Sequence, residues 1–190
     1  MRRARTAATA CASFPPLVGT APRVLVLGSM PGARSLAEQR YYAHPHNLFW
    51  RFMGEICGLD PAADYARRTA YLARCGIALW DVLAHCERSG SLDGAIVRAT
   101  EVPNPVADLL ARRRSIHTVA LNGGKAAQAF ERHVRPVLAA AVAARITVLA
   151  MPSTSPANAS IPVATKRAAW LALRARLADA SAPGRDAHRR

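Results

Sequence analysis

Cysteine is scarce in this chain of 190 residues, and its few cysteines lie far apart. Cys11, Cys57, Cys75 and Cys86 form no CxxC pair, and their spacing matches no common zinc pattern. An iron–sulfur site with four cysteine ligands would normally include such a close pair. The pattern therefore favours reduced, mostly buried thiols in a cytoplasmic protein over a disulfide framework or a metal site.

Long hydrophobic segments are also lacking, because no apolar run reaches the roughly 18 residues that span a membrane. The Arg-rich start of the chain has no apolar stretch of the kind found in secretion signals. We therefore expect no membrane partner, and we expect loose tails at residues 1–20 and 181–190. Residues 21–180 are enough for one domain with a sizeable core.

Acidic residues are few, since 12 carboxylates stand against 26 basic side chains and give a formal net charge of +14. This balance favours a polyanionic partner, nucleic acid above all, because a cationic surface releases counterions from phosphates. A second interpretation stays open. Nearly all the basic residues are arginine, with only Lys125 and Lys166 as lysines, and this composition is also typical of a GC-rich genome.

Four short apolar runs that end in turn residues predict buried strands, and the patterns between them predict helices. The predicted strands are 24–28, 77–82, 117–121 and 146–151. The predicted helices are 48–57, 65–75, 104–113, 124–134 and 165–178. Strands that alternate with helices indicate a central four-stranded parallel sheet covered on both faces, which is a three-layer α/β/α fold.

Polar residues stand where each predicted strand ends. They are Ser29, Asp81, Asn122 and Ser153. In a parallel sheet these ends share one edge, and α/β proteins bind ligands at that edge. The loop 41–50, YYAHPHNLFW, adds aromatic rings beside His and Asn, which suits stacking on a flat heterocycle. The sequence thus predicts one cleft built from five segments.

Three other kinds of site fit the sequence poorly. The run NGGK at 122–125 is not a Walker phosphate loop, because Ala126 stands where that pattern requires Ser or Thr. His44, His46 and His85 lack the nearby carboxylates that would complete a metal site. A serine esterase would need a GxSxG turn, which the chain does not contain. We therefore expect neither a metal nor a bound cofactor.

Six motifs together resemble one known family. They are GSMPGARSL at 28–36, YYAHPHNLFW at 41–50, GIALWDVL at 76–83, GSLDGAI at 90–96, LNGGKA at 121–126 and PSTSPANAS at 152–160. Across residues 23–170 the chain resembles the uracil-DNA glycosylase superfamily, and within it the hypoxanthine-DNA glycosylase family.

The resemblance implies the superfamily fold and a DNA repair enzyme. Such an enzyme hydrolyses the N-glycosidic bond of a flipped deaminated base, here hypoxanthine, and leaves an abasic site. We accordingly expect a monomer whose partner is DNA that contains deaminated bases. The expected location is the cytoplasm of a bacterium, at the nucleoid when the enzyme acts.

The resemblance also assigns residues. In related mismatch-specific glycosylases an Asn of the first loop positions the attacking water, but here Met30 occupies that position. In the hypoxanthine family the Asn of the HPxN segment takes over, which is Asn47. The resemblance implies that Tyr42 stacks on the base and that Asn122 reads its edge, although Asn122 fits a simple turn role equally well. The expected site residues are catalytic Asn47 and His44; base-binding Gly28, Ser29, Met30, Pro31, Gly32, Tyr42 and Asn122; and DNA-binding Ser153, Thr154, Ser155, Pro156, Ala157, Asn158, Ser160 and Lys166.

These residue types suit hydrolysis by a weak nucleophile. The reaction passes through a sugar cation, so a neutral amide that holds a water suffices. Backbone N–H groups of the loop 28–32 can stabilise the departing base, helped by a donor such as Asn122 or His44. A strand-nicking lyase would instead need an amine, for which Lys125 and Lys166 are the candidates. Two further alternatives stay open, namely the same fold tuned to uracil or mismatches and a non-catalytic DNA-binding member, which Met30 favours.

Overall fold

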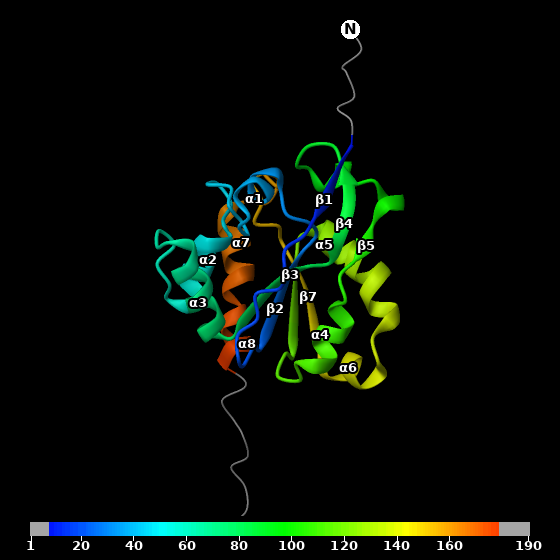
Figure 1. Ribbon diagram of the computed structural model, residues 1–190. Coiled ribbons are helices and arrows are strands. Elements are labelled where there is room, and N and C mark those ends of the chain that lie inside the picture. The colour runs from blue at the N-terminus through cyan, green and yellow to red at the C-terminus, as the bar shows by residue number, and fades with distance from the viewer. Residues whose placement is uncertain (1–7, 179–190) are drawn as a thin grey trace, which may run out of the picture.

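The computed structural model describes residues 8–178, and a parallel sheet forms its centre (Figure 1). All three strand pairings are parallel, and Gly28 lies opposite Asp81. The predicted strands are confirmed to within one residue at each end. The strands, in sheet order, are β3 (Ile77–Asp81), β2 (Val24–Gly28), β6 (Thr118–Asn122) and β7 (Thr147–Met151).

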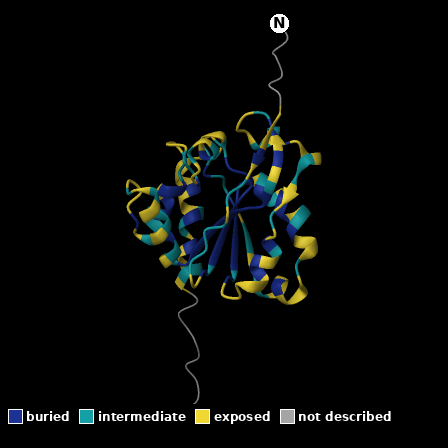
Figure 2. Cartoon of the chain, in the orientation of Figure 1, coloured by how far each residue is buried: buried dark blue, intermediate teal, exposed yellow. Residues whose placement is uncertain are grey.

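Helices cover both faces of this sheet because its strands are apolar on both sides. In β2, Val24 and Val26 pack into one core, whereas Leu25 and Leu27 pack into the other. Figure 2 shows the strands as the buried centre and the exposed residues on the outer sides of the helices. The expected three-layer α/β/α fold is confirmed. One face carries α2 (Phe49–Cys57), α3 (Tyr65–Cys75), α7 (Val163–Leu171) and α8 (Leu173–Ala178), and the other carries α4 (Val106–Arg112), α5 (Gly124–Ala129) and α6 (Ala140–Arg145).

Local sequence signals explain the ends of α2 and α3. The Asp64 side chain accepts a hydrogen bond from the backbone N–H of Arg67 (2.8 Å) and so caps the first turn of α3. Gly58 and Gly76 follow the two helices in left-handed backbone conformation, which glycine adopts without steric cost. Both helices therefore form where their patterns predict them.

Other helices differ from the predicted ranges. The helix expected over 165–178 begins earlier and is divided between α7 and α8. The helix expected over 124–134 begins as α5 and continues as a π-helix, Phe130–Val134. The short helices α1 (Ala33–Glu38) and α6 are not predicted by the sequence patterns. Each is only six residues long, which is too short for a helical period to stand out.

The structure also contains a small antiparallel sheet that the sequence patterns do not predict. It consists of β1 (Thr9–Ala12), β4 (Leu83–Arg88) and β5 (Val102–Pro103), in the order β1-β4-β5. Leu17 and Leu79 also exchange two backbone hydrogen bonds of 2.9 Å each. The expectation of a loose segment is therefore wrong for residues 8–20. Residues 1–7 and the tail at 181–190 lie outside the described part of the chain.

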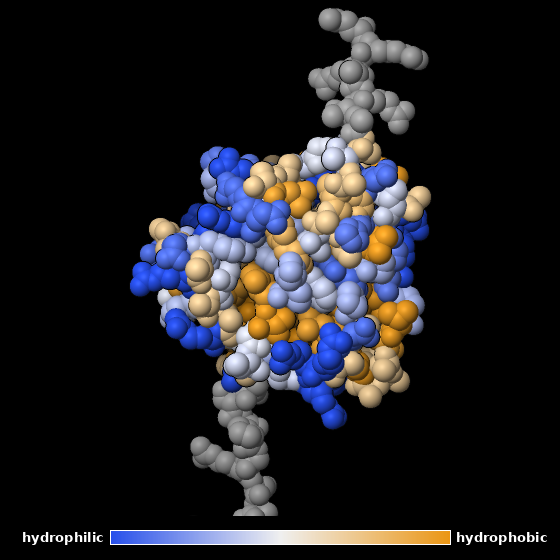
Figure 3. Space-filling view, viewed as in Figure 1, coloured by the Kyte–Doolittle hydropathy of each residue, from blue (hydrophilic) through white to orange (hydrophobic). Residues whose placement is uncertain are grey.

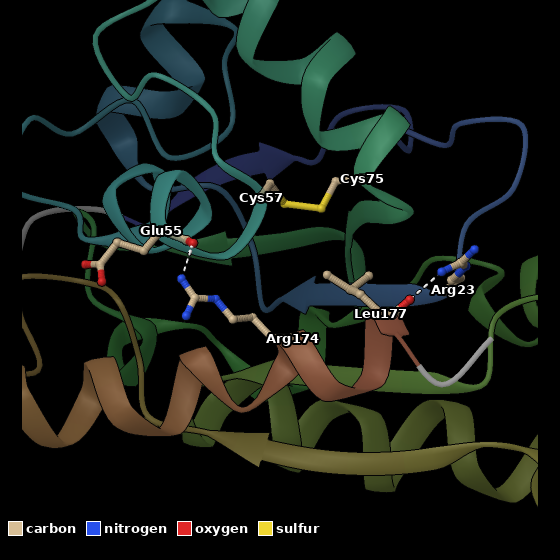
Figure 4. The surroundings of a disulfide bond; sticks show 6 residues. All are labelled: Arg23, Glu55, Cys57, Cys75, Arg174 and Leu177. Carbon is tan, nitrogen blue, oxygen red and sulfur yellow. Dashed lines mark hydrogen bonds between the residues drawn. A yellow bond between two sulfur atoms is a disulfide. The ribbon is translucent and has the colours of Figure 1, made fainter. Parts of the chain in front are cut away.

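A disulfide joins α2 to α3 (Figure 4), which corrects the expectation of four reduced thiols. Its cysteines, Cys57 and Cys75, are the last residues of the two helices, and their Cα atoms are 5.8 Å apart. Packing of the two helices brings these ends together, and the spacing in the sequence does not reveal it. Cys11 and Cys86 are free and buried, as expected.

Loss of this disulfide is expected to destabilise the fold. The bond links residues 18 positions apart, and a loop of about this length restricts the unfolded chain by about 3 kcal/mol. We expect the double variant Cys57→Ser/Cys75→Ser to lose about 2–3 kcal/mol of unfolding free energy in urea denaturation without reductant. Dithiothreitol should lower the midpoint of the wild type and leave that of the variant unchanged. A wild-type midpoint that ignores the reductant would contradict the prediction.

The surface is mixed in character. On the face drawn in Figure 3, hydrophilic and hydrophobic residues alternate in small patches. Among the described residues, no helix is both long and apolar enough to cross a bilayer. The large apolar side chains that are exposed come from several separate elements, and single exposed residues of this kind are common in folded proteins. They are Tyr71, Leu92, Val97, Val102, Val137 and Val163.

Candidate active site

A cavity of about 1410 Å³ lies at the carboxyl edge of the parallel sheet. Gly28, Asp81 and Asn122, the last residues of β2, β3 and β6, all line it. The aromatic loop contributes Tyr42 and Asn47, and the residues that follow β7 line a further side. The five segments expected to form one cleft are thus brought together, because parallel strands deliver their ends to the same edge.

Polar contacts from the chain after β3 fix the loop 28–32. The buried Arg88 side chain donates from Nη2 to the carbonyl oxygen of Pro31 (2.6 Å). Ser29 Oγ donates to Asp93 Oδ1 (2.7 Å). Burial raises the pKa of Asp93, and the hydrogen bond from Ser29 opposes that rise. The loop expected to contact the base is therefore held in one shape by Arg88 and Asp93, two residues that the sequence analysis does not place at the site.

Tyr42 is the aromatic residue of its loop that keeps exposed surface, whereas Tyr41, Phe49 and Trp50 are buried. Its backbone has a φ of 54°, which is uncommon for a residue other than glycine. Its ring stacks on Phe49, with ring centroids 3.9 Å apart and planes inclined by 22°. Burial, with a smaller contribution from Asp81, raises the pKa of its phenol. The structure thus holds a neutral ring rigidly at the cavity wall.

Asn47 lines the cavity just before α2. Its Oδ1 accepts a hydrogen bond from the backbone N–H of Phe49 (3.0 Å), so the start of the helix orients the amide. The backbone N–H of Asn47 donates to the carbonyl oxygen of His44 (2.9 Å). The His44 side chain is exposed, and its Nδ1 accepts from the N–H of His46 (3.2 Å). Because an amide oxygen has two lone pairs, Asn47 retains an acceptor for a water in the cavity.

Both amide hydrogens of Asn122 are used within the protein. Nδ2 donates to Tyr42 Oη (3.2 Å) and to Thr154 Oγ1 (3.0 Å), and Oδ1 accepts from the N–H of Thr154 (3.0 Å). The carbonyl oxygen of Thr154 in turn accepts from the N–H of Leu48 (3.0 Å). Asn122 therefore joins the end of β6 to the loop 41–50 and to the loop 153–160. For contact with a base edge, Asn122 therefore has only the second lone pair of its Oδ1 available.

Two residues expected to contact DNA are buried. Thr154 has no exposed surface, and Lys166 is 3% exposed, with its Nζ donating to the carbonyl oxygen of Asn158. Burial lowers the pKa of Lys166, and the carbonyl partner compensates part of the cost of burying the ammonium. These two residues support the loop 153–160 from within, which corrects the expected phosphate contacts. The remaining expected residues, Ser153, Ser155, Pro156, Ala157, Asn158 and Ser160, are half-buried or exposed.

Asp81 is a cavity residue to which the sequence patterns assign no role beyond its place at the sheet edge. It is 4% exposed, and its Oδ1 lies only 2.4 Å from the point where a Cβ on residue 28 would stand, so the neighbouring strand needs Gly28. Burial raises its pKa to about 8, helped by the charge of Asp93 and opposed by Arg88. An acid at the end of the otherwise apolar strand IALWD is the sequence signal that marks it.

The lysines do not present a free amine to the cavity within the part of the chain that the structure describes. Lys125 forms an ion pair with Glu101, which also pairs with Arg132 (2.8 Å) and is hydrogen-bonded to His133 Nε2 (2.8 Å). Lys166 is held by its carbonyl partner. A lyase step through either residue therefore has no geometric support. Among the described residues, no three His, Cys, Asp or Glu side chains are grouped to hold a metal ion.

Comparison with known proteins identifies the family. The sequence model of the uracil DNA glycosylase superfamily matches residues 15–174. The chain belongs to this superfamily. The resemblance seen in the six motifs is therefore confirmed, and the position of the cavity at the carboxyl edge agrees with a ligand site in this kind of sheet.

Individual relatives agree with this assignment. A protein named hypoxanthine DNA glycosylase from Methanosarcina barkeri is 42% identical over 84 residues, which are 44% of this chain and 53% of the relative. One of the same name from Methanosarcina acetivorans is 33% identical over 117 residues, 60% of this chain and 72% of the relative. The match thus spans about half the length of the first relative.

A solved structure has the same fold. It is a solution NMR structure of a provisionally assigned uracil DNA glycosylase from Methanosarcina acetivorans. The TM-score is 0.75 at 27% identity, over 90% of this chain and 99% of that one. The fold class expected from the sequence is confirmed by this likeness as well.

Proposed function

We propose that this protein hydrolyses the N-glycosidic bond of hypoxanthine in DNA and leaves an abasic site. The observation that carries the proposal is the place of Asn47, whose amide is oriented by α2 within the same cavity as Tyr42 and the loop 28–32. The shared name of the two archaeal relatives supports the choice of base. The net charge of +14 supports DNA as the partner.

The reaction needs little from the nucleophile. As the bond to the base breaks, the sugar carbon becomes cationic and accepts a weakly nucleophilic water. Asn47 Oδ1 accepts a hydrogen bond from this water and positions it, while α2 prevents the amide from turning away. Backbone N–H groups of the loop 28–32, which lines the cavity, stabilise the negative charge that the base carries as it departs.

The flipped nucleotide enters the cavity from the strand. Removal of a base from the stack costs a few kcal/mol, and a mispaired hypoxanthine pays less than a paired adenine. Tyr42 offers its ring for stacking, and the exposed residues Pro156 and Ala157 lie at the cavity lining where the strand must bend. All these segments belong to one chain, so a monomer suffices for the reaction.

Two other functions are outcomes of the test. Excision of uracil is the second candidate, because the solved structure of similar fold is assigned to uracil. A non-catalytic DNA-binding role is the third candidate, and it is supported by Met30, which replaces the usual water-binding Asn of the first loop. Met30, however, packs into the core with 5% exposure, so position 30 contributes to the core while Asn47 supplies the amide.

The test is a single-turnover assay on labelled oligonucleotides that contain deoxyinosine, deoxyuridine, deoxyxanthosine or only normal bases. We expect release of hypoxanthine and an intact strand until alkali cleaves the abasic site. Release of uracil alone would keep the mechanism and change the specificity. Binding without release of any base would overturn the proposal, and an adduct trapped by borohydride would overturn simple hydrolysis.

A further inference from the structure

Asp81 is the one buried carboxyl group of the cavity whose hydrogen-bonding capacity is left open. Within the described part of the chain its Oδ2 is buried and has no hydrogen-bond partner. Buried polar atoms without a partner are rare in folded proteins and call for an explanation. The other carboxyl group that lines this cavity, Asp93, already accepts a hydrogen bond from Ser29 Oγ. Among the described residues that line the cavity, Asp81 is therefore the carboxyl group with a buried oxygen that no other group pairs with.

The pairing of β2 with β3 fixes the position of Asp81. It ends β3 directly opposite Gly28, the first residue of the loop 28–32, and its side chain occupies the space that any larger residue there would need. Its backbone carbonyl oxygen accepts from Asn104 Nδ2 (3.0 Å), which fixes the end of the strand. The carboxyl group and the Tyr42 hydroxyl thus both lie within 4 Å of the point where a Cβ on residue 28 would stand, and both residues line the cavity.

The surroundings keep this carboxyl group in its neutral form. Burial is the main cause, and the nearby Asp93 adds to it, while Arg88 acts in the opposite direction. Tyr41 and Tyr42, whose pKa values the charge of Asp81 would also raise, are themselves kept neutral by burial. A neutral carboxyl group carries one O–H donor, unlike a carboxylate, which only accepts. With both hydrogens of Asn122 in use, Asp81 is the buried side chain of the cavity that can offer an acidic proton.

We propose that Asp81 is the general acid that protonates the departing purine at a ring nitrogen. The inference rests on the proposed function and deepens it, because it concerns the same cavity and the same bond. It selects for purines, since N7 of a purine is an acceptor remote from the bond that breaks, and pyrimidines have no such atom.

The electron pair of the C1′–N9 bond passes into the purine ring, the O–H proton of Asp81 passes to N7, and hypoxanthine leaves as a neutral molecule. The water held by Asn47 forms the new bond to C1′ and loses a proton to solvent. The Asp81 carboxylate regains a proton from solvent once the base has left, so the net change is the addition of one water.

The experiment compares wild type with Asp81→Asn in single-turnover release of hypoxanthine from about pH 6 to about pH 10. The Asn side chain keeps the shape and a donor but cannot give up a proton. We expect the variant to react at least about 100-fold more slowly, and we expect its rate to lose the fall that the wild type shows above about pH 8. Asp81→Ala should be at least as slow, and affinity for deoxyinosine DNA should change far less than the rate.

A matched control is Asp108→Asn, an aspartate of α4 that does not line the cavity; it should react like wild type. Thermal melting of each variant separates loss of chemistry from loss of fold. If wild type releases hypoxanthine and Asp81→Asn equals it in rate and pH profile, the inference fails alone. If wild type releases no hypoxanthine, the proposed function fails and the inference fails with it.

Discussion

Replacement of Asn47 by Ala is expected to slow hypoxanthine release by about 1000-fold in a single-turnover assay. The physical reason is the loss of the group that orients the water, since positioning and hydrogen bonding of a nucleophile account for factors of this size. The amide is held by the backbone N–H of Phe49, so Asn47 already has its working orientation before DNA binds. Affinity for deoxyinosine DNA should stay within a few-fold of wild type, because the amide acts on the water.

His46→Ala is the matched control for this prediction. His46 belongs to the same loop and is exposed. Its hydrogen bond to His44 uses its backbone N–H, which the substitution keeps, so that only a ring contact with His44, with centroids 5.6 Å apart, is lost. The Ala variant at position 47 also loses a helix-capping bond, so about 1 kcal/mol of stability should disappear with it. A rate within tenfold of wild type, with the fold intact, would remove Asn47 from the mechanism.

The central sheet is readable from the sequence because its strands are buried on both faces. Such strands form continuous apolar runs that stop at turn residues, as β2 does before the loop 28–32. The small sheet is not readable in this way. β1 has the sequence TACA and becomes a strand only through its pairing with β4, where the charged Arg88 is buried by its bonds to nearby carbonyl groups.

The location of the cavity was predictable from the sequence, whereas the contacts of its individual residues were less so. Parallel strands bring their ends to one edge whatever the side chains are, so the five segments could be placed together from their order alone. The roles of single residues depend on contacts between distant segments. Asn122 is engaged by Thr154, 32 positions later, and Lys166 is buried because a carbonyl group of the preceding loop receives its ammonium. Gly123 similarly permits close approach of Ser153, which only the folded chain reveals.

The protonation state of Asp81 makes a prediction about stability that needs no DNA. In the unfolded chain an aspartate ionises near pH 3.8, whereas burial and Asp93 raise the pKa of Asp81 in the folded chain to about 8. Below the lower value both states hold the proton, so Asp81 adds nothing to the pH dependence of stability there. As pH rises, the unfolded state releases its proton first, so the stability that the neutral group contributes declines, and it is lost once pH passes about 8.

Asp81→Asn removes this dependence, because an amide does not titrate. Relative to wild type, the variant is therefore expected to gain about 3–4 kcal/mol of unfolding free energy between about pH 5 and about pH 8, at about 1.36 kcal/mol for each pKa unit. Urea denaturation of both proteins at the two pH values measures this gain. The contribution of Asp93 to the pH dependence cancels in the comparison, because both proteins contain Asp93. A stability difference that stays the same at both pH values would show that Asp81 is ionised in the folded protein, which would also remove the acid from the proposed mechanism.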